Sequence, residues 1–69
     1  EALQTVVKTA FGQRRKMIRA SLKGLGVDPL VLTEMAGIDP SLRAERLSIP
    51  DFGALARAYV TLKQKREQS

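Results

Sequence analysis

Five cationic side chains are concentrated in residues 11–25, a stretch that contains no carboxylate. They are Arg14, Arg15, Lys16, Arg19 and Lys23. The planar guanidinium group of arginine binds a phosphate through two parallel hydrogen bonds, and lysine adds a compact point charge. A cluster of this kind predicts a surface that binds a polyanion. An A-form RNA helix suits such side chains, because it exposes phosphates and 2′-hydroxyls across a wide, shallow minor groove, and the alternative is a cationic helix face that is simply solvated.

The spacing of these cations predicts a helix that begins at Gln13 and ends near Gly24. In such a helix Arg15, Arg19 and Lys23 recur every four residues, with Lys16 beside them, and form one basic stripe. Like charges four residues apart destabilise a helix by about 0.2–0.5 kcal/mol per pair. The helix therefore needs either core packing or an anionic partner as a further source of stability.

The same helix would carry an apolar row next to the basic stripe, made of Ile18, Leu22 and Leu25. Arg14 falls on the other side of this row from Arg15. We expect Arg14 to be partly buried and paired with Asp39 or Glu45, a pair that would orient the helix without touching a ligand.

Other chemistries find little support in the sequence. There is no His and no Cys, so the usual general base and the usual metal ligands are missing. The carboxylates of residues 27–56 lie at expected helix starts and turns, where they serve as caps. Gly24-Leu25-Gly26 follows a helix and not a strand, which is the wrong context for a phosphate-binding loop. We assign no catalytic, cofactor-binding or metal-binding residue to this chain.

The net charge of +5 is unevenly distributed along the 69 residues. Residues 1–26 carry six cations and one carboxylate, and residues 27–56 carry two cations and five carboxylates. Residues 57–69 carry four cations and one carboxylate. This layout predicts one basic and one acidic surface. No apolar run approaches the roughly 18 residues of a membrane span, and the absence of cysteine fits a reducing cytoplasm, so we expect a cytoplasmic protein without a membrane partner.

The elements that position the cations are all expected to be helices, because no segment alternates with period two. Helices are predicted over residues 3–11, 13–24, 29–36 and 41–44, with one bent continuous helix over residues 3–24 as the alternative for the first two. The last helix opens at the Ser48–Asp51 capping box and is lined with apolar residues as far as Leu62, after which the sequence has no apolar face and is expected to fray. Asp28-Pro29, Asp39-Pro40 and the capping box Ser48–Asp51 supply three of the helix starts. The expected fold is all-α, a small orthogonal bundle of four to five short helices forming one domain over residues 1–69. Its predicted core consists of Val6, Val7, Phe11, Ile18, Leu22, Leu32, Phe52, Leu55 and Tyr59, and the buried side of the third helix of Leu32, Met35 and Ala36.

Two blocks of residues carry a resemblance to a known family. The first is Phe11-x-x-Arg14-Arg15-Lys16 with Leu22 six residues on. The second is Gly37-Ile38-Asp39-Pro40, Arg43-Ala44-Glu45 and Leu47-Ser48, followed by Phe52 and Leu55. In this order and spacing the sequence resembles the C-terminal domain of the small-subunit (16S) ribosomal RNA adenine N6,N6-dimethyltransferases. This is the dimethyladenosine transferase family associated with kasugamycin resistance.

The resemblance implies a C-terminal helical domain that helps to hold the immature small ribosomal subunit. In that family a preceding Rossmann-like catalytic domain binds S-adenosylmethionine and methylates two adjacent adenosines near the 3′ end of the RNA. This chain has neither a glycine-rich cofactor loop nor an Asn-Leu-Pro-Tyr type motif for a flipped adenine, so no cofactor is expected in it. What the resemblance carries over is Arg14-Arg15-Lys16, as an RNA-facing or domain-orienting element. The expected partners are the small-subunit ribosomal RNA and the catalytic domain.

Two other functions remain open at the level of the sequence. The chain could be a non-catalytic interaction module, or a lid, that docks on its own catalytic domain or on an acidic partner protein. A helix-turn-helix DNA reader is a weaker alternative. Affinities for ribosomal RNA, duplex DNA and the catalytic domain would separate these possibilities.

Overall fold

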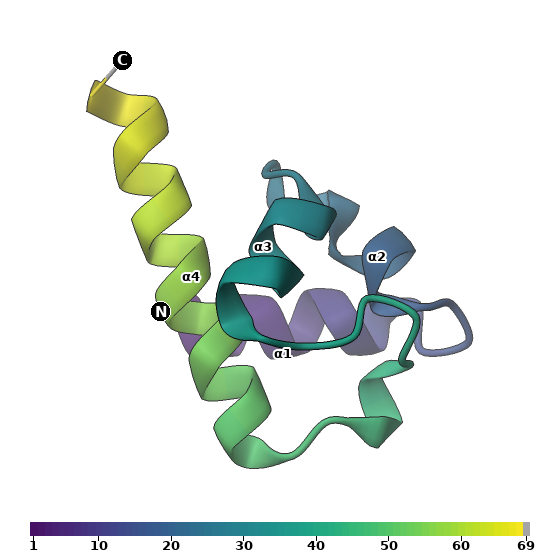
Figure 1. Ribbon diagram of the computed structural model, residues 1–69. Coiled ribbons are helices and arrows are strands. Elements are labelled where there is room, and N and C mark those ends of the chain that lie inside the picture. The colour runs from purple at the N-terminus through teal and green to yellow at the C-terminus, as the bar shows by residue number, and fades with distance from the viewer. Residues whose placement is uncertain (69) are drawn as a thin grey trace.

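The computed structural model describes the backbone of residues 1–68 and the side chains of residues 1–65. Its elements are α1 (Ala2–Gly12), α2 (Ile18–Ser21), the 3-10 helix η1 (Leu22–Leu25), α3 (Pro29–Ala36), the 3-10 helix η2 (Ala44–Arg46) and α4 (Ile49–Gln68) (Figure 1). The described backbone contains no strand, only an isolated antiparallel bridge between Met17 and Arg43. The predicted all-α fold is confirmed.

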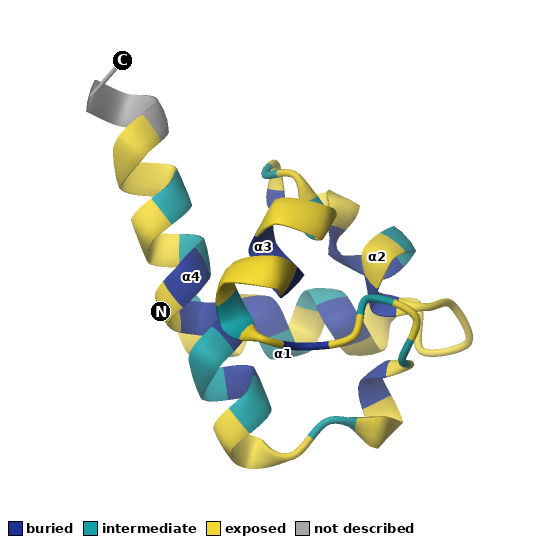
Figure 2. Cartoon of the chain, viewed as in Figure 1, coloured by how far each residue is buried: buried dark blue, intermediate teal, exposed yellow. Residues whose placement is uncertain are grey.

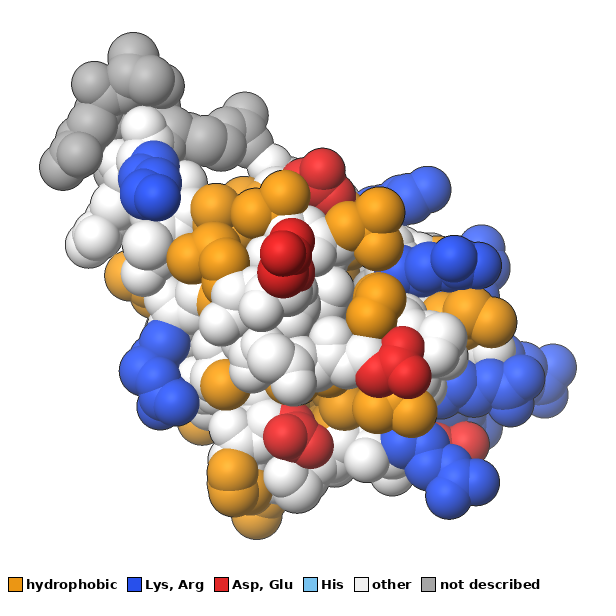
Figure 3. Space-filling model, in the orientation of Figure 1, with side chains coloured by type: hydrophobic (Ala, Val, Ile, Leu, Met, Phe, Trp, Pro, Cys, Tyr) orange, Lys and Arg blue, Asp and Glu red, His pale blue; other side chains and the backbone are white. Residues whose placement is uncertain are grey.

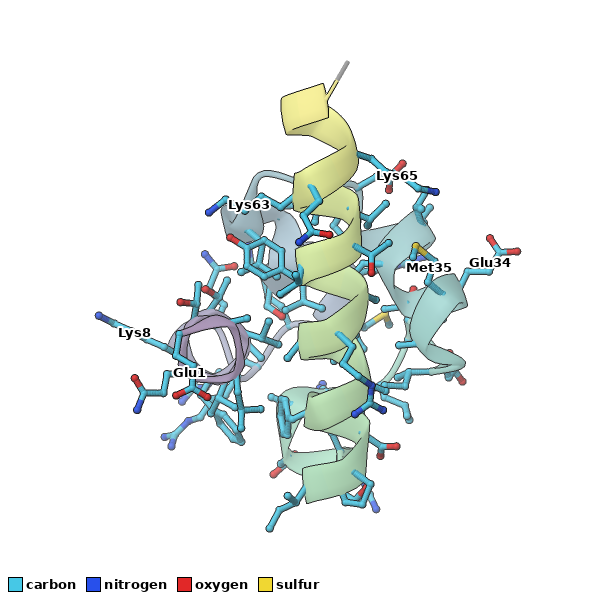
Figure 4. All side chains as sticks on the ribbon, turned by 90° about the vertical axis from the view of Figure 1, so that its left-hand side faces the viewer. Glu1, Lys8, Glu34, Met35, Lys63 and Lys65 are labelled. Atoms are coloured by element: carbon cyan, nitrogen blue, oxygen red, sulfur yellow. The ribbon has the colours of Figure 1, made fainter. Side chains whose placement is uncertain are left out.

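The longest helix, α4, packs against two of the other helices. It contacts both α1 and α3. Figure 4 looks along the axis of α1 while α4 runs across the view, so the two helices cross steeply, with α3 on the opposite side of α4. The second half of α4 extends beyond the rest of the bundle (Figure 1).

The start and the end of α3 follow from its local sequence. The carboxylate of Asp28 accepts a hydrogen bond of 2.9 Å from the backbone N–H of Leu30, and Pro29 occupies the first helical position. Gly37 closes the helix in the left-handed conformation, with φ of 71°, which a residue without Cβ adopts at little cost. The predicted helix over residues 29–36 is confirmed.

The capping box at the start of α4 is also confirmed. The backbone N–H of Ser48 donates to the Asp51 carboxylate at 2.9 Å, and the N–H of Asp51 donates to the Ser48 hydroxyl at 3.3 Å. The helix does not stop at the point after Leu62 where fraying is expected. It continues past Leu62 to Gln68, through Lys, Gln, Arg and Glu residues that favour helix even without an apolar face to bury.

The core lies where α1, α2, α3 and α4 meet (Figure 2). Of the nine predicted core residues, six are buried: Val6, Ile18, Leu22, Leu32, Phe52 and Leu55. Val7 and Tyr59 are partly buried and pack against this cluster. Phe11 is 43% exposed, with its ring 5.8 Å from that of Phe52, so its place in the core was predicted wrongly.

The buried side of α3 differs from the prediction at one further residue. Met35 is 45% exposed, and Thr33 is buried in its place. Burial of this polar side chain is compensated locally, because its hydroxyl donates to the carbonyl oxygen of Pro29 at 2.9 Å. Leu32 is buried and Ala36 partly buried, as predicted.

Two predicted helices are shorter than expected or displaced. The backbone of residues 13–16 forms a turn and a bend instead of the first turn of a helix, and α2 begins only at Ile18. The helix predicted over residues 41–44 is also absent. The chain turns at residues 40–41, and the short helix η2 follows at Ala44–Arg46.

Candidate nucleic-acid interface

The five predicted RNA-binding residues are all exposed, but they do not form one helical stripe. Arg14, Arg15 and Lys16 lie in the turn between α1 and α2, Arg19 lies in α2, and Lys23 lies in η1. The prediction of a continuous helix under these residues was therefore wrong. We call these five residues the basic surface.

A short connection and a bridge to a distant segment hold the backbone of the basic surface. The N–H of Lys16 donates to the carbonyl of Gln13 at 2.9 Å and closes the turn. The N–H of Ile18 then donates to the carbonyl of Leu42 at 2.7 Å, and the N–H of Arg19 donates to the carbonyl of Pro40 at 3.1 Å. These bonds satisfy amides at the start of α2 that have no acceptor within the helix, and no side chain caps it.

The side chain of Ile18 anchors the same segment in the core. It is fully buried, between the exposed residues Met17 and Arg19. The inner side of α2 and η1 is also buried, through the side chains of Ser21, Leu22 and Leu25. The backbone that carries the cations is therefore held in two ways, by hydrogen bonds to residues 40–42 and by the packing of apolar side chains beneath it.

The bridge brings two further cations to this side of the molecule. The backbone of Arg43 lies opposite that of Met17 in the antiparallel bridge, and Met17 directly follows the basic turn. Arg46 lies a few residues further on, in η2. Both side chains are exposed. Figure 3 shows Lys and Arg side chains gathered on the side where Figure 1 places α2 and the turn before it. The count of charge along the sequence placed both arginines in the acidic region of residues 27–56. Such a count cannot show that the bridge brings them to the side of the basic surface.

None of these cations is neutralised by a neighbouring acid. Among the described side chains, residues 1–65, no Lys or Arg nitrogen lies within 4.0 Å of a carboxylate oxygen. Asp28 lines the same shallow groove as Arg19 and Lys23, but its carboxylate is occupied by the N-cap hydrogen bond of α3. The positive charge of the surface is therefore available to a ligand.

The ion pair predicted between Arg14 and Asp39 or Glu45 was also wrong. Arg14 is exposed and forms no ion pair with Asp39 or Glu45. The carboxylate of Asp39 instead accepts hydrogen bonds from the hydroxyl of Ser41 at 2.7 Å and from its backbone N–H at 2.9 Å. These bonds, the hydroxyl's above all, stabilise the ionised carboxylate and hold the pKa of Asp39 below its ordinary value of 3.8.

Among the described residues, no group of three or more His, Cys, Asp or Glu could hold a metal ion. None of the described helices is long and apolar enough to cross a membrane. Two of the three aromatic rings offer little to a ligand, because Phe52 is buried and Tyr59 is partly buried, with the Lys63 ammonium 5.8 Å from its ring centroid, whereas Phe11 is 43% exposed.

Curated relatives carry most of this sequence. Ribosomal RNA small subunit methyltransferase A of Afipia carboxidovorans is 56% identical over 62 residues, which make up 90% of this chain and 22% of that protein. The protein of the same name from Rhodopseudomonas palustris strain TIE-1 is 52% identical over 68 residues, 99% of this chain and 24% of that protein. The chain corresponds to the C-terminal part of these methyltransferases.

The resemblance drawn from the two motif blocks is thus confirmed. The namesake from Azorhizobium caulinodans agrees, with 56% identity over 57 residues, 83% of this chain and 20% of that protein. The match covers the C-terminal part of these methyltransferases, of which the chain spans less than a quarter of the length. No family model and no solved structure matches the chain.

Proposed function

We propose that this chain is the RNA-gripping and orienting domain at the C-terminal end of an S-adenosylmethionine-dependent ribosomal RNA methyltransferase. The enzyme would dimethylate two adjacent adenosines near the 3′ end of small-subunit RNA. The domain would bind the immature subunit in the cytoplasm and present this RNA to the catalytic part of the protein. The observation that supports this role is the set of exposed cations, none paired with an acid among the described residues, in a family whose members are named as ribosomal RNA methyltransferases.

The geometry suits recognition of the shape of an RNA backbone. The cations lie on one turn, one short helix and one 3-10 helix, so their tips spread over an area instead of following one helical row. Proteins that recognise double-stranded RNA by its shape contact phosphates and 2′-hydroxyls across the minor groove. A backbone fixed by the bonds to Leu42 and Pro40 presents the cations in a prepared arrangement, which lowers the entropy lost on binding.

In this proposal the domain contributes affinity and orientation, and the methyl transfer takes place elsewhere. S-adenosylmethionine and the reacting adenosine would be held by the part of the enzyme outside this chain. Arg14, Arg15, Lys16, Arg19 and Lys23 would hold phosphates, and Arg43 and Arg46 would extend the contact across the bridge.

The salt dependence of RNA binding tests this function. Each phosphate neutralised contributes about −0.7 to −0.9 to the slope of log affinity against log salt, so contacts by Arg15, Arg19 and Lys23 alone give a slope of about −2 to −3. The double variant Arg19→Glu, Lys23→Glu should flatten the slope by about 1.5 or more. Both side chains are exposed, so the circular dichroism and melting temperature should stay close to those of the unmodified chain.

The matched control is the double variant Lys8→Glu, Lys63→Glu. It makes the same change in net charge at exposed lysines of α1 and α4 that lie outside the basic surface (Figure 4). Equal slopes in the two double variants would mean that net charge, and not this surface, drives binding. Affinity for duplex DNA equal to that for structured ribosomal RNA would favour the DNA reader instead.

A further inference from the structure

A shallow apolar groove lies between the first turn of α1 and the middle of α4, and the RNA-binding proposal does not use it. Its volume is about 470 Å³, and its lining includes Ala2 and Leu3 from α1 and Ala56, Arg57 and Val60 from α4. Leu3 is 37% exposed and Val60 is 40% exposed. Large apolar side chains gathered in a concave surface are suited to cover by another segment.

The position of the groove indicates which segment could cover it. Glu1 lines the groove itself, so a residue that precedes Glu1 begins at its edge. Figure 4 shows Glu1 at the near end of α1, beside α4. In the relatives the matched region is the C-terminal part and only 20–24% of the length, so most of such a protein precedes the residue that corresponds to Glu1.

We propose that the residues immediately preceding Glu1 in the longer protein pack into this groove and fix the domain relative to the part before it. A tethered segment reaches an effective concentration on the order of millimolar, so modest apolar contacts suffice for docking. The groove favours an apolar side chain between Leu3 and Val60. It also favours a carboxylate beside Arg57, whose guanidinium has no acidic partner within 4.0 Å among the described side chains.

The groove is separate from the basic surface, so docking and RNA binding do not compete. The first turn of α1 and the middle of α4 lie on the side of Figure 1 opposite to α2 and the turn before it. Docking therefore does not depend on the proposed RNA contact. It would give the basic surface a fixed direction relative to the rest of the enzyme, which an accessory domain on a free linker lacks.

A second exposed apolar face serves as an internal comparison. On α3, Leu30 is 54%, Val31 41% and Met35 45% exposed. None of these residues adjoins Glu1 in the grooves that Glu1 lines. If the preceding part of the protein covered exposed apolar residues without selection, the α3 face would be covered as well.

Cysteine protection in the full-length protein, without RNA, tests the proposal. This chain contains no cysteine, so Val60→Cys, Leu30→Cys and Ile49→Cys each introduce one thiol, once cysteines elsewhere in the protein are replaced by serine. Ile49 is 84% exposed and gives the rate for an uncovered helical position. The rate of maleimide labelling is measured for each variant in buffer and in denaturant, and the ratio gives the protection.

We expect the thiol at position 60 to be protected about tenfold or more relative to positions 30 and 49, because labelling then requires the segment to open. When this chain is expressed on its own, without the residues that precede Glu1, the thiol at position 60 should again be labelled fast. Equal protection at positions 60 and 49 would overturn the proposal. Protection at position 30 but not at position 60 would also overturn it and would place the contact on α3. Neither outcome depends on RNA affinity.

Discussion

Residues 13–19 and residues 28–37 are two short segments that the molecule fixes in different ways. The first is held by residues far along the chain, through the bonds from Ile18 to Leu42 and from Arg19 to Pro40. The second is closed by its own ends, with the Asp28 cap at one end and the left-handed Gly37 at the other. The cations of the proposed interface lie on and beside the first segment, while α3 carries none.

This difference teaches where the basic surface is vulnerable. A locally capped helix keeps its shape as long as its caps remain, so damage elsewhere reaches it only through global unfolding. The basic segment has no cap of its own and takes its shape from the bridge and from the burial of Ile18. Its binding geometry should therefore respond to changes at residues that never touch RNA.

The largest effect is expected from Ile18→Ala. The side chain is fully buried, and its truncation should lower the free energy of unfolding by about 2–5 kcal/mol, measured by urea denaturation. A domain of this size could unfold altogether, so Ile18→Val, with an expected loss of about 0.5–1.5 kcal/mol, provides a folded variant for RNA titration.

Leu32→Ala is the matched control for this comparison. Leu32 is also fully buried, but it lies in α3, so its loss should cost a similar free energy without loosening the basic segment. The RNA titration compares two folded variants of equal stability, Ile18→Val and a substitution at Leu32. At a temperature where both are folded, the affinity for RNA should fall further for Ile18→Val. Equal affinities would mean that the bridge does not affect RNA binding.

An intermediate effect is expected from the cap of α3. Asp28→Ala removes the acceptor for the Leu30 amide and should lower the free energy of unfolding by about 1 kcal/mol. Asp28→Asn keeps an acceptor of similar quality and should cost little. The salt slope of RNA binding should stay unchanged in the asparagine variant. A changed slope would mean that Asp28, which shares a groove with Arg19 and Lys23, modulates the interface through its charge.

The same contrast explains how much of the fold was predictable. The helix starts at Asp28-Pro29 and Ser48–Asp51 and the left-handed glycine at position 37 are local signals, and the structure confirms each of them. The turn at residues 13–16 was not predicted, because Arg15 continues the four-residue spacing of Arg19 and Lys23 and so favours a helix. The turn is closed by the bond from Lys16 to Gln13, and the amides of Ile18 and Arg19 directly after it bond to residues 40–42; tertiary contacts of this kind override local periodicity.

The candidate site was predictable in its residues but not in its arrangement. All five predicted cations are exposed, whereas the single stripe, the partial burial of Arg14 and its ion pair were predicted wrongly. Arg43 and Arg46 were missed, since counting charge along the chain cannot show which segments meet. One local signal was available: Asp39-Pro40-Ser41 is typical of a turn in which aspartate accepts bonds from the residue two positions on, which leaves it occupied.

The smallest effect should arise in that turn, which carries the Pro40 carbonyl that receives the Arg19 amide. Because the pKa of Asp39 is lowered in the folded protein, the ionised carboxylate stabilises the fold above its unfolded pKa near 3.8, and this contribution is lost as the pH falls through the folded value.

Ser41→Ala removes the hydroxyl bond and keeps the backbone one, so the pKa of Asp39 should rise part of the way back. The carboxyl ¹³C shift of Asp39 measures this, and Ser41→Thr, which keeps a hydroxyl, is the control. The stability difference between the unmodified chain and Ser41→Ala should be present at neutral pH and shrink below about pH 4. A difference that grows in acid would reverse the sign and show that the turn does not stabilise the charged form.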